Sequence, residues 1–223
     1  VAGTTGAGKS ELLRTWLGAL ALMHPPDRLT FLLVDYKGGA AFRSLVGLPH
    51  TVGLVTDLSG DLSTRALVSL RAEVTRRERL LERHGATDLS ELRSMAVGAA
   101  AHVEVPPSLV VAVDEFATLA NEVPGFVDGL VDVAQRGRSL GIHLLLATQR
   151  PAGVVTDHIR ANTSLRICLR VADDDESRDV IGVPDAGRID RATPGRAMVR
   201  IGADRPFPVQ VAWSGGTGGR IES

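Results

Sequence analysis

The chain opens on Gly3-Thr4-Thr5-Gly6-Ala7-Gly8-Lys9-Ser10, a stretch that settles its fold class. It matches the pattern G-x-x-x-x-G-K-[ST], in which glycines, a lysine and a hydroxyl stand at fixed offsets. Glycines let successive backbone N–H groups converge on an anion at a helix N-terminus. The stretch predicts a phosphate-binding loop, here called the P-loop. In it, Lys9 reaches the β and γ phosphates of ATP and Ser10 offers a hydroxyl to Mg²⁺.

The residues after the P-loop have the spacing of a helix. Leu13, Trp16, Leu17 and Leu20 recur at helical intervals, and the pattern stops at the pair Pro25-Pro26. A glycine-rich turn that merely precedes a helix is the alternative, and the position of this helix favours the P-loop. The strand expected before the loop is reduced to Val1-Ala2, so the chain is expected to be an excerpt of a longer protein.

Apolar runs and helical patterns alternate along the next 120 residues. Strands are predicted at 29–34, 52–55, 109–113 and 142–147. Three helices are predicted between them: one at 63–84, a second that begins after the Asp88/Glu91 capping box, and a third around 126–134. Such alternation predicts an α/β fold with a mainly parallel central sheet flanked by helices. Ligands of such sheets bind beyond the carboxyl ends of the strands.

The last third of the sequence is β-rich. Strands are predicted at 165–171, 197–201 and 207–213, and the first of them contains Cys168, which we expect to be a buried, inert thiol. The domain prediction is one ATPase domain over 1–213, with its first strand truncated, followed by a glycine-rich linker or tail at 214–223.

Acidic and amide side chains follow two of the predicted strands. Asp114 and Glu115 end the strand at 109–113, where an aspartate can hold a metal and a glutamate can polarise the attacking water. Gln149 ends the next strand and is predicted to sense the γ phosphate. Each has a plain alternative, a polar residue at a strand end. Arg65, Arg136 and Arg138 are candidates for an arginine that completes a neighbouring subunit's site, or are solvated surface.

Two further groups leave alternatives open. Lys37, one of only two lysines, lies beside Gly38 and Gly39 in a loop that is either a surface loop or part of the nucleotide edge. The run Asp173-Asp174-Asp175-Glu176 lacks the glycine turn of a calcium loop, so a helix N-terminal cap is the better interpretation. No histidine spacing predicts a structural metal.

Composition narrows the class of protein. The net charge is −1 and hydrophobic residues make up 44%, but no apolar run is long enough to span a bilayer. The chain also carries no secretion signal, so a cytoplasmic location is expected. Near-zero net charge argues against a constitutively basic nucleic-acid surface, although a ring could still gather arginines in a pore.

The motifs resemble one family, the FtsK/SpoIIIE ATPases of the additional-strand, RecA-like type of P-loop NTPase. The resemblance rests on residues 2–11, which include Glu11, on Val113-Asp114-Glu115-Phe116, and on residues 138–143 and 147–151. Residues 35–39, 165–171, 175–178 and 194–196 are similar to the type VII secretion branch, which contains EccC and EssC.

The resemblance implies a hexameric motor domain whose protein is anchored to the inner membrane by parts outside this sequence. It implies an ATP site with Mg²⁺, in which residues 3–11 bind the nucleotide and Ser10 and Asp114 hold the metal. Glu115, Lys9 and Gln149 then act in catalysis together with Arg65 as the trans-acting arginine. In the type VII branch the cargo is a small helical secreted protein, handled with other secretion subunits. A double-stranded DNA translocase, a slow ATP-dependent assembly module and a small-molecule kinase are the alternatives.

Overall fold

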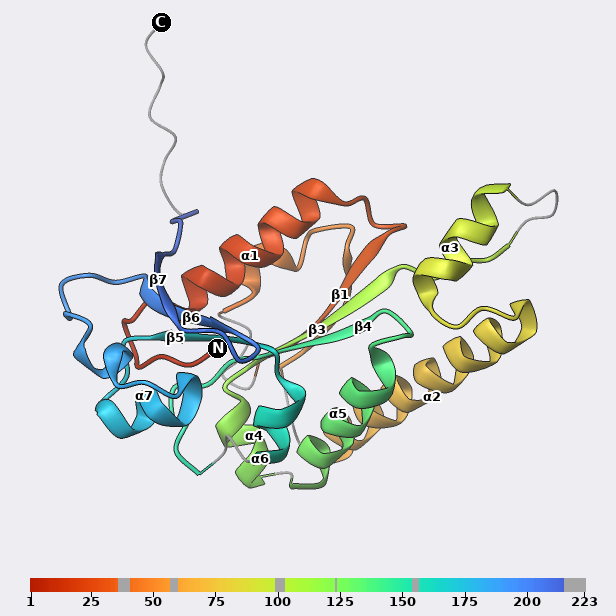
Figure 1. Cartoon of the computed structure of the whole chain (residues 1–223). Helices are drawn as coiled ribbons and strands as arrows, with labels where there is room; N and C mark the ends of the chain where they lie inside the picture. Colours follow the sequence, from red (N-terminus) through yellow and green to blue (C-terminus); the bar gives the residue numbers. More distant parts are fainter. Residues whose placement is uncertain (36–40, 57–59, 99–102, 123, 154–156, 215–223) are drawn as a thin grey trace, which may run out of the picture. The chain divides into compact units, whose positions relative to one another are not determined.

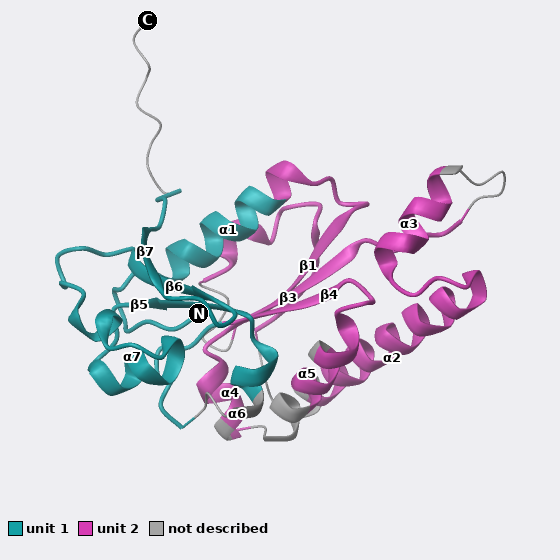
Figure 2. Cartoon of the chain, in the orientation of Figure 1, with its two compact units in different colours: residues 1–20, 147–223 teal, residues 21–146 magenta. Residues whose placement is uncertain are grey.

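The computed structural model describes residues 1–35, 41–56, 60–98, 103–122, 124–153 and 157–214. The chain divides into two compact units, coloured separately in Figure 2. One consists of Val1–Leu20 with Ala147–Ser223, and here it is called the P-loop unit. The other, Ala21–Leu146, is called the sheet unit.

The sheet unit is built on four parallel strands in the order β2-β1-β3-β4. Their bounds are β1 (Leu29–Asp35), β2 (Thr51–Val55), β3 (Ser108–Asp114) and β4 (Ile142–Leu146). Strands β1 and β3 are almost wholly buried, as continuous apolar runs predict for parallel strands. Asp35 pairs in register with Asp114, so two carboxylates lie side by side at the carboxyl end of the sheet.

Helices cover this sheet and connect its strands (Figure 1). The unit contains η1 (Arg43–Leu45), α2 (Gly60–His84), α3 (Leu89–Gly98), α4 (Phe116–Glu122) and α5 (Pro124–Gly137). Helix α5 packs on β4, and α2 packs on α5. Leu70, Val74 and Leu81 on α2 are buried, as the helical spacing of its apolar residues predicts.

The P-loop unit contains three antiparallel strands in the order β5-β6-β7. They are β5 (Leu165–Leu169), β6 (Arg196–Ile201) and β7 (Phe207–Gln210), with helices α6 (Asp157–Asn162), α7 (Asp174–Ile181) and η2 (Asp185–Arg188) between them. Helix α1 (Lys9–Met23) begins in this unit at the end of the P-loop.

Most predicted elements are confirmed, and most of their predicted ends lie within three residues of the observed ends. The strand at 207–213 is shorter than predicted, because β7 ends at Gln210. The prediction of a single helix around 126–134 was incomplete, because a separate helix, α4, begins directly after Glu115. The glycine-rich tail lies outside the described residues beyond Ser214, and the single-domain boundary at 213 stays a prediction. No described helix combines the length and the apolar character needed to cross a membrane.

Two smaller predictions are also confirmed. Cys168 is fully buried, and burial raises the pKa of its thiol to about 12, so the thiol is inert at neutral pH. Asp173 caps α7, its carboxylate accepting hydrogen bonds from the N–H groups of Asp175 (3.0 Å) and Glu176 (2.8 Å). No cluster of potential metal ligands was found among the residues that the structure describes.

Candidate nucleotide site

The P-loop is anchored at its start by backbone pairing within its own unit. Ala2 forms parallel bridges to Thr148 and Cys168, and so stands between the segment after β4 and strand β5. The Gly3 N–H donates to the Thr148 carbonyl (3.1 Å). Val1-Ala2 therefore leads into the P-loop as a short extended segment that is paired on both sides.

Side chains and backbone of the loop continue this anchoring. Both the N–H (2.9 Å) and the hydroxyl (3.0 Å) of Thr4 donate to the Arg170 carbonyl. The Gly195 N–H donates to the Ala7 carbonyl (2.8 Å), and Ala7 packs in a buried cluster with Leu169. The loop is held from three sides before any ligand binds, so its backbone is preorganised.

The glycines of the P-loop adopt the left-handed region that a phosphate nest requires. Gly6 has φ +77° and Gly8 has φ +101°. Their N–H groups meet no protein acceptor in the described part of the chain, and Lys9 begins α1 directly afterwards. Convergent backbone donors at the N-terminus of a 15-residue helix form an anion site.

Gly8 also has no room for a side chain. A Cβ at this position would lie 2.8 Å from the Gly195 nitrogen and 3.0 Å from its Cα. The loop around Gly195 thus closes on the P-loop backbone. The sequence had marked residues 194–196 only through the family resemblance, because a glycine in a loop carries no signal of its own for a contact 187 positions away.

Gln149 lies against the P-loop, as its predicted role as a sensor requires. The Thr5 hydroxyl donates to its Oε1 at 2.8 Å. This hydrogen bond orients the Gln149 amide group, whose Nε2 is the atom that can donate to an anion. Thr5 itself is exposed, while Lys9 is buried. Glu11, in the first turn of α1, forms an ion pair with Arg14.

The predicted acidic pair lies in the sheet unit, at the carboxyl end of β3. Asp114 and Glu115 are 5% and 3% exposed, and Asp35 beside them on β1 is 1% exposed. The sequence had marked Asp35 only within residues 35–39, through the family resemblance. Its Oδ2 accepts a hydrogen bond from the Ala41 N–H (2.9 Å). Lys37, whose role the sequence left open, lies outside the described residues.

Glu115 has the backbone geometry of a functional turn. Its φ is +59°, and no other described non-glycine residue has a positive φ. A side chain in this region costs about 1–2 kcal/mol. The conformation turns the chain from β3 into α4, whose first N–H groups, on Thr118 (3.2 Å) and Leu119 (3.4 Å), are bonded to the Glu115 carbonyl. Strain of this kind is concentrated at active sites.

The three candidate arginines have different surroundings. Arg136 is paired with Asp132 (2.9 Å) and Glu78 (3.6 Å). Arg138 lines a hollow of about 610 Å³ with Ser108, at the amino end of β3 and thus at the opposite end of that strand from Asp114. Arg65 is exposed on the first turns of α2, and no ion pair is found for it among the described residues.

Comparison with known proteins identifies a family. The FtsK/SpoIIIE family matches residues 1–153. Over 218 residues the chain is 42% identical to the type VII secretion system protein EssC of Staphylococcus aureus, and 39% identical to the ESX secretion system protein EccC of Geobacillus thermodenitrificans. These alignments cover 97% and 96% of the chain but only 14% of either relative.

Solved structures agree with these relatives. The cytoplasmic domain of the type VII secretion ATPase EccC of Thermomonospora curvata is 36% identical, with a TM-score of 0.89 over 99% of this chain and 26% of that one. The pCW3 conjugation coupling protein TcpA with ATPγS is 27% identical, with a TM-score of 0.80 over 95% of this chain and 59% of that one.

A third structure contains ATPases 2 and 3 of Thermomonospora curvata EccC with a signal sequence peptide. It is 25% identical, with a TM-score of 0.78 over 95% of this chain and 38% of that one. Together these matches confirm the predicted fold class, the P-loop NTPase fold with a mainly parallel central sheet and a small antiparallel sheet near the C-terminus.

Proposed function

Because this chain belongs to the FtsK/SpoIIIE family and is an ATPase domain, we propose that its P-loop and its acidic pair act on one bound ATP. The P-loop geometry carries the proposal: Gly6 and Gly8 hold a left-handed backbone whose N–H groups can receive phosphate oxygens. Lys9 contacts the β and γ phosphates, and residues 3–11 contain the nucleotide contacts.

Each remaining residue has one role. Glu115 orients and polarises the water that attacks the γ phosphate, and its constrained backbone fixes the direction of its carboxylate. Gln149 donates from Nε2 to the γ phosphate, positioned by the hydroxyl of Thr5. Arg65 extends from the exposed start of α2 toward the site of a neighbouring subunit.

The residues present suit Mg²⁺. Ser10 and Asp114 offer a hydroxyl and a carboxylate, the hard oxygen ligands that this ion prefers, and Asp114 is buried beside a second carboxylate, Asp35. When bound, the ion would neutralise charge on the phosphate oxygens. Asp114 is the protein carboxylate that would hold it, and Ser10 is the hydroxyl.

The domain is proposed to drive type VII secretion of small helical proteins. The identities of 42% and 36% with EssC and EccC support this cargo. The chain is 36% identical to a part that makes up 26% of the EccC cytoplasmic domain, against 25% for its match to ATPases 2 and 3 of the same protein, which supports its equivalence to an ATPase domain outside that pair.

The setting of the domain is a further part of the proposal. We propose that residues 1–213 form one subunit of a hexameric ring, followed by a linker. The ring lies on the cytoplasmic side of the inner membrane, to which other parts of the protein anchor it, and contacts further secretion subunits.

Double-stranded DNA is the second candidate cargo, and the 27% identity to the conjugation coupling protein TcpA favours it over any other alternative. Phosphate release by the domain, measured at physiological salt, separates the two. We expect acceleration by a helical secretion-signal peptide and none by a duplex. Stimulation by duplex alone would reverse the assignment of cargo without affecting the ATP site.

A further inference from the structure

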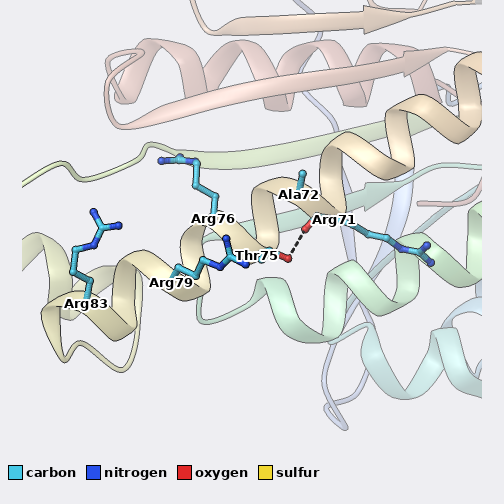
Figure 3. A pocket seen from close by; sticks show the side chains of 6 residues that line it. All are labelled: Arg71, Ala72, Thr75, Arg76, Arg79 and Arg83. Carbon is cyan, nitrogen blue, oxygen red and sulfur yellow. Dashed lines mark hydrogen bonds between the residues drawn. The ribbon is translucent and has the colours of Figure 1, made fainter.

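Four arginines occupy the solvent side of α2 in the sheet unit (Figure 3). Together with two short side chains they line an open hollow of about 520 Å³. The residues that line it are here called the arginine face: Arg71, Ala72, Thr75, Arg76, Arg79 and Arg83. On a helical projection this face lies opposite the buried Val74 and Leu81, so it is the solvent-facing side of the helix.

The arginine face has a regular repeat along the helix axis. Arg71, Thr75, Arg79 and Arg83 follow one another at intervals of four residues, close to one helical turn. At 1.5 Å per residue the face is about 18 Å long. Ala72 and Thr75 have short side chains, so the hollow lies over them and between the longer side chains of the arginines.

Three of the four charges on this face are not balanced within the described part of the chain. Among the described residues, no carboxylate pairs with Arg71, Arg79 or Arg83, whereas Arg76 is paired with Glu73 (2.8 Å) and Glu104 (3.1 Å). Like charges four residues apart oppose helix formation. The whole chain carries a net charge of −1, so this excess of positive charge is a local feature of the face.

We propose that the arginine face docks an acidic helix of a partner protein. A helix with Asp or Glu at every fourth position presents carboxylates at the same repeat of about 6 Å, and each guanidinium fork can hold a carboxylate through two hydrogen bonds. The proposal does not depend on ATP hydrolysis, because none of these residues belongs to the proposed nucleotide site.

A nucleic-acid duplex fits the same face less well. Glu78 and Glu82 are exposed on α2; on the helical projection Glu78 lies beside the arginine face, and Glu82 lies within it, between Arg71 and Thr75. Duplex DNA carries one negative charge for about every 1.7 Å of its axis, so its phosphates would meet these carboxylates along with the arginines. An acidic helix with one carboxylate about every 6 Å carries fewer negative charges over the same length, so it meets less of this repulsion.

The test measures binding of fluorescent alanine-based helical peptides to the whole chain. One peptide carries Glu at every fourth position, and its control carries Gln at the same positions. We expect binding of the Glu peptide alone. Replacing Arg79 and Arg83 together by Ala should weaken binding about tenfold, since it removes two ion pairs. Arg205→Ala, which changes an exposed arginine outside α2, should leave binding unchanged.

Charge reversal provides an independent arm. With Glu at positions 79 and 83, the chain should bind a Lys peptide of the same pattern in preference to the Glu peptide. Circular dichroism and ATP affinity report whether each variant remains folded. Equal binding of the Glu and Gln peptides would overturn the proposal. So would tighter binding of a duplex of equal charge that the same two alanine substitutions abolish.

Discussion

At the scale of single residues, the sequence predicted which residues form the P-loop but not the backbone conformations and side-chain contacts around it. The P-loop pattern predicted the roles of Gly8 and Lys9 because fixed offsets in sequence correspond to fixed positions on a loop and a helix start. The left-handed backbone of Glu115 and the Thr5–Gln149 hydrogen bond could not be predicted. Both depend on what lies nearby in space, and no local propensity encodes them.

A substitution at Gly8 tests whether the loop is as tightly enclosed as the structure indicates. Gly8→Ala combines a φ of +101° with a Cβ 2.8 Å from the Gly195 nitrogen, so we expect a loss of about 2–3 kcal/mol in the free energy of unfolding. Chemical denaturation measures this change.

Gly18→Ala is the matched control for that substitution. Gly18 lies within α1, where an added Cβ meets no atom within 4 Å, so alanine should stabilise the chain by about 0.5–1 kcal/mol. Equal effects at the two glycines would contradict the enclosed P-loop.

At the scale of elements, long and periodic segments were the predictable ones. Helix α1 was predicted from the spacing of its apolar residues and its stop before Pro25, and strand β3 was predicted to within one residue at each end from its unbroken apolar run. Helix α4 was missed because its seven residues hold too little periodicity to be distinguished from a loop. The Asp88/Glu91 box was half confirmed: Asp88 accepts the Glu91 N–H, but the Glu91 carboxylate bonds to Thr87.

Helix α2 depends on one buried arginine. Arg77 is 4% exposed and donates to Glu73 (2.7 Å) and to the Leu140 carbonyl (2.8 Å). Arg77→Ala would leave a buried carbonyl and a carboxylate without this donor, so unfolding free energy should fall by about 3 kcal/mol. Arg76→Ala, at a half-exposed site, should cost less than about 1 kcal/mol. Similar losses at the two positions would rule out this role for Arg77.

The same helix predicts a dependence of stability on pH. Partial burial raises the pKa of Glu73, but hydrogen bonds from Arg76 and Arg77 outweigh it, so the pKa lies below the ordinary 4.5. A lowered folded pKa means that the stabilisation is complete above 4.5 and is lost as the pH falls through the lower value. The stability difference between wild type and Glu73→Gln should therefore shrink below about pH 4.5. A constant difference from pH 7 to pH 3 would exclude the linkage.

At the scale of the whole molecule, the fold class was predictable and the cargo was not. Alternating strands and helices after a P-loop are compatible with few folds, and the family match confirms the choice. The substrate of a motor depends on surfaces and on neighbouring subunits, and one chain of net charge −1 does not reveal them. The secretion branch was recognised only through the resemblance of its motifs.

The central claim is that one ATP is held by the P-loop and hydrolysed with Glu115. The most direct test measures ATP affinity and single-turnover phosphate release for wild type, Lys9→Ala and Glu115→Gln. We predict that Glu115→Gln binds ATP as wild type does and releases phosphate at least about a hundredfold more slowly, while Lys9→Ala loses binding. Hydrolysis by Glu115→Gln at the wild-type rate would contradict the account.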